Sequence, residues 1–267
     1  MHGGYGAREF RVGQARQQSG HRRSLPAPDD AAGPGGTWHW NTYPGIAVDI
    51  PSFSYQFSFE QSPDWSRTYA PGGELKVYAE HCVDKYGLRS RIRFGTMVVA
   101  AEFDVDHGWW RVQTDFAGEL TARFLINASG VLTTPNLPDI AGVDTFAGVT
   151  VHTARWDHSL DLTGKRVAVI GTGASAVQVI PEIAPEVSSL TVFQRTPIWC
   201  FPKFDVPLAA PIRWAMRIPG GKSLQRLVSQ AYVEATFPIA AQYFTVFPLA
   251  KRMESAGRAY LRRQVHD

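Results

Sequence analysis

The sequence predicts an α/β fold, with antiparallel strands first, a strand-helix-strand unit in the middle and a helical tail. Three observations predict this fold. Val167–Ile170 is continuously apolar and runs into closely spaced glycines, which is typical of a buried parallel strand that leads into a helix. Strand-forming residues concentrate between 91 and 128, with turn residues between them. Beyond residue 206 a helical periodicity is interrupted by prolines.

The elements follow from local patterns. Apolar residues at helical spacing and a closing glycine predict a helix over 73–87. Alternating aromatic and β-branched residues predict three strands, joined by turns at 106–108 and 117–118. These predicted strands span residues 91–103, 109–115 and 120–128. The central unit comprises a strand at VAVIG, residues 167–171, a helix through Ala184 and a strand at 190–193.

Composition indicates a globular protein. The 267 residues are 44% hydrophobic and 12% aromatic, which excludes a disordered chain. Two cysteines, Cys82 and Cys200, are too few for a disulfide framework or for a zinc site by themselves. So few cysteines indicate a reducing compartment, and we therefore expect a cytoplasmic protein. The first residues lack the apolar core of a signal peptide.

The positive charge lies at the two ends. Net charge is +2 over residues 1–34, −5 over 35–202 and +6 over 203–267. This distribution does not fit a nucleic-acid groove, which would interleave basic and aromatic residues across a folded domain. Prolines and polar residues interrupt Val228–Ala250, so we expect no transmembrane segment. Peripheral membrane binding through the basic tail is a weaker alternative.

The strongest local motif is VAVIGTGASAVQVI, a GxGxxA pattern after a strand and at the start of a helix. The first glycine permits the turn, the second lets a pyrophosphate approach the backbone, and the alanine allows close packing. This pattern predicts a Rossmann-like dinucleotide site, although a glycine turn without a ligand is the alternative. Its candidate cofactor contacts are Gly171, Thr172, Gly173, Ala174, Ser175 and Ala176.

The second strand of the unit ends in FQRT, with no acidic residue where an NAD-binding unit carries one for the ribose hydroxyls. Arg195 and Thr196 stand there instead. A guanidinium can bind a ribose 2′-phosphate through paired hydrogen bonds. We therefore expect NADP to be preferred over NAD, while an ordinary solvated arginine is the alternative.

A second motif, FAGVTVHTARWD at residues 146–157, resembles the FxGxxxHxxxW(P/D) fingerprint of the Baeyer–Villiger and related flavin-containing monooxygenases. GGTWHWNTYPGIAVDIPS, at residues 35–52, is similar to the segment around the flavin in that family. The resemblance runs from about Gly35 to at least Phe201 and includes the GxGxxA unit. It implies that His152 couples the position of NADPH to catalysis.

The resemblance also implies an FAD site. Gly36, Thr37, Trp38, Asn41, Asp49 and Tyr55 match positions that line FAD, and Val98 matches a position near its adenine end. Asp49 and His152 are the candidate catalytic residues, with Asp49 near the reactive ring. Packing of Trp38 and other aromatic residues in the core is the alternative. Ala47 stands where Baeyer–Villiger enzymes often have arginine, so the resemblance implies flavin monooxygenation in general more strongly than ketone oxygenation in particular.

The implied function is an FAD- and NADPH-dependent monooxygenase that transfers one oxygen atom from O₂ to a small organic substrate. That substrate is a ketone or a soft nitrogen or sulfur nucleophile. The expected domains are a disordered or aberrant segment at 1–34, a partial FAD-binding domain at 35–145, the fingerprint with the NADP-binding Rossmann domain at 146–205, and a helical segment at 206–267.

The resemblance further implies truncation at both ends. The family has an earlier GxGxxG unit that holds the FAD pyrophosphate, and it continues well beyond the last residue here. Residues 1–34 are read either as a misassigned start or as a disordered arm. The alternative function is therefore a non-catalytic remnant that at most binds NADP(H).

Overall fold

The computed structural model describes residues 32–130, 132, 135–196, 198, 203–240 and 249–264. The chain divides into two compact units. The first combines the described residues up to Asn41 with Ala79–Trp156, and the second combines Thr42–Tyr78 with Asp157–Asp267. Most of the segment expected to be aberrant or disordered, residues 1–31, lies outside the described residues. The domain boundaries expected from the sequence stay predictions.

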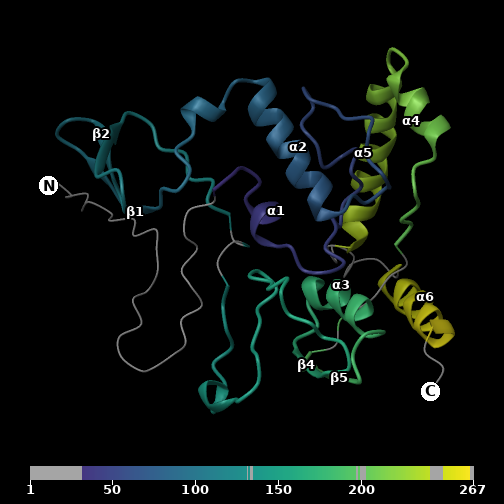
Figure 1. Ribbon diagram of the computed structural model, residues 1–267. Coiled ribbons are helices and arrows are strands. Elements are labelled where there is room, and N and C mark those ends of the chain that lie inside the picture. Colours follow the sequence, from purple (N-terminus) through teal and green to yellow (C-terminus); the bar gives the residue numbers. More distant parts are fainter. Residues whose placement is uncertain are drawn as a thin grey trace, which may run out of the picture. The chain divides into compact units, whose positions relative to one another are not determined.

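The first unit is built on a three-stranded antiparallel sheet (Figure 1). Its strands are β1 (Val98–Asp104), β2 (Trp109–Thr114) and β3 (Glu119–Ala122). The register pairs Ala101 with Val112 and Val112 with Leu120, which places apolar side chains on one face. The opposite face carries charged and polar pairs. Left-handed glycines lie at the predicted turns, Gly108 and Gly118, each at φ 71°.

Two of these strands are shorter than predicted. Residues 89–91 form a 3-10 turn, so the first strand begins at Val98 and not at residue 91. The third strand ends at Ala122 and does not continue to residue 128. A strand needs a neighbour for its backbone groups, and no described strand pairs with residues 123–128. Phe124 and Ile126 keep the alternating pattern of a strand but are 86% and 88% exposed.

Two helices precede the sheet in the chain. α1 (Thr37–Trp40) is a single turn that follows Gly36. α2 (Gly72–Lys85) confirms the helix predicted from the apolar spacing, and it buries Leu75, Cys82 and Val83 along one face. A second 3-10 turn lies at Val143–Thr145.

The second unit contains the predicted strand-helix-strand motif. β4 (Arg166–Ile170) and β5 (Ser189–Phe193) pair in parallel, and α3 (Ala174–Ile183) connects them (Figure 1). Ala176, Val179 and Ile183 form the buried face of α3. β4 was expected to be buried on both faces, but its residues alternate between exposed and half-buried. The physical reason is that its sheet has only two strands among the described residues.

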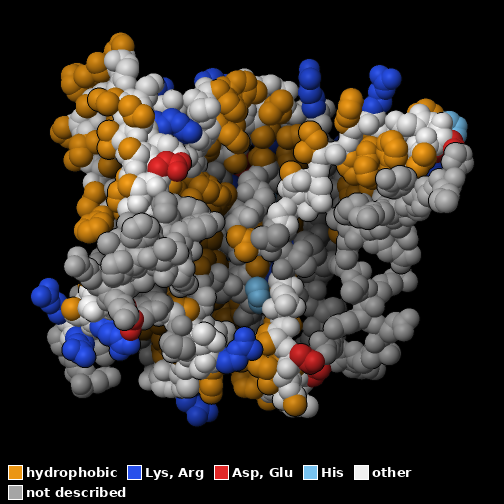
Figure 2. Space-filling view, turned by 180° about the vertical axis from the view of Figure 1, so that it is seen from behind, with side chains coloured by type: hydrophobic (Ala, Val, Ile, Leu, Met, Phe, Trp, Pro, Cys, Tyr) orange, Lys and Arg blue, Asp and Glu red, His pale blue; other side chains and the backbone are white. Residues whose placement is uncertain are grey.

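The helical tail forms longer helices than the proline positions predicted. α4 (Ala210–Arg217), α5 (Gly221–Ala240) and α6 (Leu249–Gln264) follow one another, and α4 and α5 pack together (Figure 1). α5 continues through Pro238, although proline lacks the N–H that would donate to the carbonyl four residues earlier. Figure 2 shows hydrophobic side chains gathered on part of the surface, and Trp214, Leu224 and Leu227 are each more than 60% exposed.

Basic residues of α4 and α5 bind the loop over residues 53–64. Arg217 pairs with Asp64, Lys222 donates to the Gln61 carbonyl at 3.1 Å, and Arg226 donates to the Gln56 carbonyl at 2.9 Å. Part of the basic tail therefore serves internal contacts, which weakens the membrane-binding alternative. Among the described residues, no helix is long and apolar enough to cross a bilayer.

Candidate functional site

The glycine turn has the geometry that an anion site needs. Gly171 has φ 103°, which a side chain would disfavour, and Gly173 precedes the first residue of α3. A Cβ added at Gly173 would meet no atom within 4 Å, so the backbone stands open to an approaching group. The first N–H groups of a helix lack internal partners and lie at its positive end. The turn and the start of α3 can therefore hold a phosphate.

Parallel pairing brings the end of β5 beside this turn. The Gly171 N–H donates to the Phe193 carbonyl at 2.9 Å. Gln194 Nε2 then donates to Thr172 Oγ1 at 3.4 Å, and Thr172 Oγ1 lies 3.5 Å from the Thr196 carbonyl. Arg195 lies between these residues and is exposed. The structure thus brings together the two sequence features from which a phosphorylated dinucleotide was predicted.

The segment that carries Asp49 also lies in the second unit. Asp49 is exposed, and it follows the buried Tyr43 and Val48. The Tyr43 hydroxyl donates to Gln178 Oε1 on α3 at 2.8 Å. Burial raises the pKa of Tyr43; a hydrogen bond with Ser175 lowers it, and the nearby Asp49 carboxylate raises it further. The hydrogen bonds of Gln178 with Tyr43 and with the Ala47 carbonyl hold the segment that leads to Asp49 against α3.

The other residues expected at FAD are divided between the units. Gly36, Thr37, Trp38, Asn41 and Val98 belong to the first unit, whereas Tyr55 belongs to the second. Asn41 is buried, and its side-chain nitrogen donates to the carbonyls of Thr37 and Leu132 at 3.0 and 3.2 Å. An asparagine amide has two N–H groups. Asn41 can therefore meet a cofactor only through its side-chain oxygen.

His152 is half-buried in the first unit. Its Nδ1 accepts the Ala154 N–H at 3.1 Å, which leaves the proton of the neutral ring on Nε2. Burial lowers the pKa of His152, and the positive charge of Arg155 lowers it further. His152 is therefore a neutral donor through Nε2 at pH 7.

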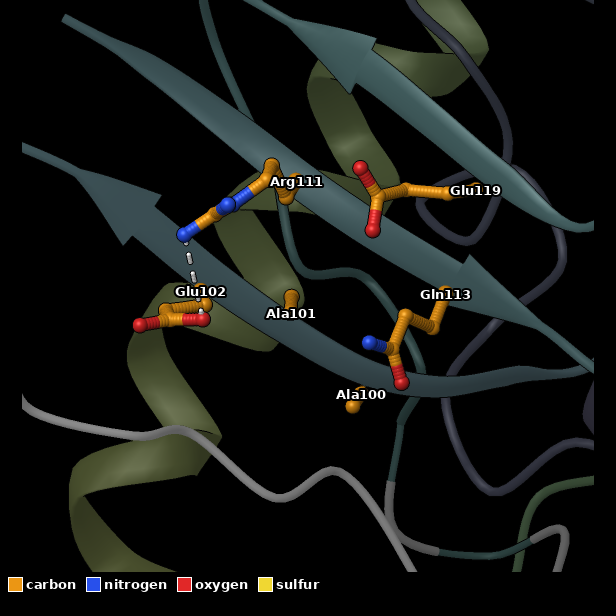
Figure 3. Close-up of a pocket in the computed structure, with 6 residues that line it drawn as sticks. All are labelled: Ala100, Ala101, Glu102, Arg111, Gln113 and Glu119. Atoms are coloured by element: carbon orange, nitrogen blue, oxygen red, sulfur yellow. Dashed lines mark ion pairs between the residues drawn. The ribbon is translucent and has the colours of Figure 1, made fainter. Parts of the chain in front are cut away.

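A shallow depression of about 190 Å³ lies on the polar face of the three-stranded sheet (Figure 3). Arg111 and Glu102 form an ion pair of 3.6 Å across neighbouring strands, and Glu119 approaches from the third strand. These residues are open to solvent, and they differ from the groups expected to bind a cofactor. The depression carries no feature of a dinucleotide site.

Sequence reasoning missed three residues that hold the candidate site in place. Gln178 lies one helical turn beyond Ser175, and that helix spacing is the signal that could have placed both on one face. Lys203 Nζ donates to the Val48 carbonyl at 3.0 Å, beside Asp49. Arg155 lies over the ring of Trp40. For Lys203 and Arg155 the sequence offers no local signal, since their partners are remote in the chain.

Known proteins are similar to this chain over most of its length. A Baeyer–Villiger monooxygenase of Streptomyces coelicolor is 46% identical over 193 residues, which cover 72% of this chain and 37% of that protein. A solved structure of an oxidized steroid monooxygenase bound to NADP is 45% identical, with a TM-score of 0.64, over 70% of this chain and 36% of that one. The structure of OTEMO in complex with FAD and NADP is 37% identical, with a TM-score of 0.63, over 75% and 38%.

The chain thus spans well under half the length of these relatives. The likeness confirms the mixed α/β fold, and it confirms the resemblance to Baeyer–Villiger monooxygenases that the motifs predicted. Residues 47–210, more than half of the chain, match the family model described as pyridine nucleotide-disulphide oxidoreductase. The chain therefore belongs to the pyridine nucleotide-disulphide oxidoreductase family, with Baeyer–Villiger monooxygenases among its relatives.

Proposed function

We propose that this chain binds NADPH and provides the nucleotide-binding part of a flavin-dependent monooxygenase of the Baeyer–Villiger type. The observation that carries the proposal is the contact between the Gly171 turn and the end of β5, which places an open helix start beside Arg195. NADP in one relative and FAD with NADP in another support the same cofactors here.

The residues of the turn fit NADP(H). The N–H groups at the start of α3 would hold the pyrophosphate, and the open space beside Gly173 lets it approach. The Arg195 guanidinium would pair with the 2′-phosphate that distinguishes NADP from NAD. When bound, NADPH supplies a hydride, and the protein supplies its binding and orientation.

FAD as the second cofactor depends on the resemblance and on the relatives. The side-chain oxygen of Asn41 would accept a hydrogen bond from FAD, because both side-chain N–H groups already donate to carbonyls within the chain. Asp49 would supply a carboxylate close to the nucleotide turn, and neutral His152 would supply a proton donor at Nε2. The substrate is a small organic ketone or a soft nitrogen or sulfur nucleophile, with O₂ as the oxygen source.

Isothermal titration with NADP⁺ and NAD⁺ tests nucleotide binding directly. We expect NADP⁺ to bind at least tenfold more tightly, and Arg195→Glu to abolish that preference with little change for NAD⁺. Arg166→Glu, at the exposed start of β4, is the matched charge control. Equal affinity for the two nucleotides in the native chain would contradict the proposal that Arg195 binds the 2′-phosphate.

Activity separates an enzyme from a chain that only binds nucleotide. Flavin absorbance in the purified protein, with NADPH consumption that depends on an added ketone or thioether, would support the monooxygenase. The alternative is a chain that at most binds NADP(H) without turnover. Colourless protein that still binds NADP⁺ would favour that alternative.

A further inference from the structure

Two side chains from the nucleotide-binding part hold the backbone that leads to Asp49. Gln178 of α3 accepts a hydrogen bond from the Tyr43 hydroxyl at 2.8 Å, and its Nε2 donates to the Ala47 carbonyl at 2.9 Å. Both polar atoms of Gln178 are therefore used by the segment 43–49. The contact is close, since a Cβ on Gly45 would lie 2.5 Å from the Gln178 carbonyl oxygen.

Lys203, which lies between β5 and α4, holds the next peptide. Its Nζ donates to the Val48 carbonyl at 3.0 Å and lies 4.5 Å from the centre of the Tyr69 ring. The chain that follows Lys203 is itself held by backbone hydrogen bonds. The Leu208 N–H donates to the Ser66 carbonyl at 2.8 Å, and the Thr68 N–H donates to the Val206 carbonyl at 3.0 Å. The two carbonyls before Asp49 are thus each bound by a different side chain.

The charges around Lys203 agree with this role. Burial lowers the pKa of Lys203, the carboxylates of Asp205 and Asp49 raise it, and Arg67 lowers it. The ammonium contacts the Val48 carbonyl and the Tyr69 ring, and the charges of the two carboxylates favour its protonated form. These interactions offset the free-energy cost of removing the ammonium from water. Lys203→Met would keep the aliphatic stem and remove every one of these interactions.

One of the two holding residues belongs to an element that frames the nucleotide turn. Gln178 lies on the helix that begins directly after Gly173, whereas Lys203 lies between β5 and α4 and holds the same segment from there. A ligand that orders the start of α3 would also order Gln178, and through it the segment 43–49 that Lys203 supports as well. We infer that Gln178 and Lys203 are positioning residues that couple nucleotide binding to the placement of Asp49; the inference rests on the proposed function.

Hydrogen exchange on the full chain, with and without saturating NADP⁺, tests the coupling. We expect NADP⁺ to slow exchange at least fivefold in two segments, 171–177 and 45–49. In Gln178→Met and in Lys203→Met the slowing at 45–49 should be lost, while that at 171–177 remains. Lys222→Met is the matched control, because it also removes an ammonium from a loop carbonyl, that of Gln61, and should preserve both effects.

The outcomes separate this inference from the proposed function. Slowing at 171–177 alone in the native chain, or slowing at 45–49 that survives in both variants, would overturn the coupling and leave nucleotide binding intact. No slowing in either segment would overturn both. If Gln178→Met fails to fold, Gln178→Glu still accepts from Tyr43 but cannot donate to Ala47, and it should lose the response at 45–49 in the same way.

Discussion

The guanidinium of Arg155 lies 4.1 Å from the centre of the Trp40 ring. This contact joins two motifs that are far apart in the sequence, the histidine-containing fingerprint and the aromatic segment expected near the flavin. Arg155 also donates to the Ala154 carbonyl and lowers the pKa of His152 through its charge. A single side chain thus links the Thr37–Trp40 turn to the environment of His152.

Replacing Arg155 tests the strength of that link. We expect Arg155→Met to lower the free energy of unfolding by about 1–2 kcal/mol, because a partly desolvated guanidinium over an indole contributes about that much. Arg155→Lys should recover part of the loss. Urea denaturation provides the measurement, and Arg123→Met, at an exposed arginine that follows β3, is the control with an expected change below about 0.5 kcal/mol. Equal effects of the two methionine variants would contradict the link.

The stability of the fold should depend on the protonation of His152. Burial, and then Arg155, lower its pKa in the folded chain below the ordinary value of 6.5. Below pH 6.5 the unfolded chain therefore binds more protons at this position, so the free energy of unfolding falls as the pH falls. Above pH 6.5 this contribution is complete and constant.

Urea denaturation between pH 5 and pH 7.5 measures this dependence. His152→Gln should flatten the part of the curve below pH 6.5, whereas His158→Gln, at an exposed histidine, should leave that part unchanged. A slope that persists in His152→Gln would assign the dependence to other groups.

The central part of the fold could be predicted because its signals are local. The apolar run of β4, the glycine turn and the apolar face of α3 adjoin in the sequence, and parallel pairing then requires Arg195 to lie near the turn. The ends of the outer strands could not be predicted in this way. Residues 123–128 have the composition of a strand, but a strand also needs a neighbour, which composition does not report.

The supports of the candidate site depend on contacts that no local pattern contains. Gln178 and Ala47 are 131 residues apart, and Lys203 and Val48 are 155 residues apart. Hydrophobic periodicity identifies which face of a helix is buried, but it does not identify the remote carbonyl that a polar side chain will bind. Local patterns therefore indicate candidate reactive groups, but they do not indicate the residues that hold them.

Gly45 should tolerate substitution worse than other left-handed glycines. It has φ 77°, and an added Cβ would lie 2.5 Å from the Gln178 carbonyl oxygen and 2.7 Å from Glu182 Cγ. Gly108 has a similar φ of 71°, with no atom within 4 Å of an added Cβ. We expect Gly108→Ala to cost about 1 kcal/mol from the backbone alone, and Gly45→Ala to cost at least about 3 kcal/mol because α3 must also shift.

Thermal and urea unfolding of the two alanine variants measure this difference. Since the backbone conformations match, the excess loss in Gly45→Ala reports the close approach of the 43–49 segment to α3. Similar losses in both variants would show that the segment can move away from the helix at little cost.

Arg226 should matter more for stability than its place in a basic, helical tail implies. Its guanidinium donates to the Gln56 carbonyl at 2.9 Å and approaches the Phe53 carbonyl at 3.4 Å, so it binds two carbonyls of one loop. Arg226→Met would leave these carbonyls without that donor and should lower the free energy of unfolding by about 1–3 kcal/mol.

Sedimentation with anionic vesicles tests whether Arg226 instead binds a membrane surface. We expect neither the native chain nor Arg226→Met to pellet, because this arginine is engaged within the protein; pelleting of the native chain that Arg226→Met abolishes would instead assign the residue to a membrane surface.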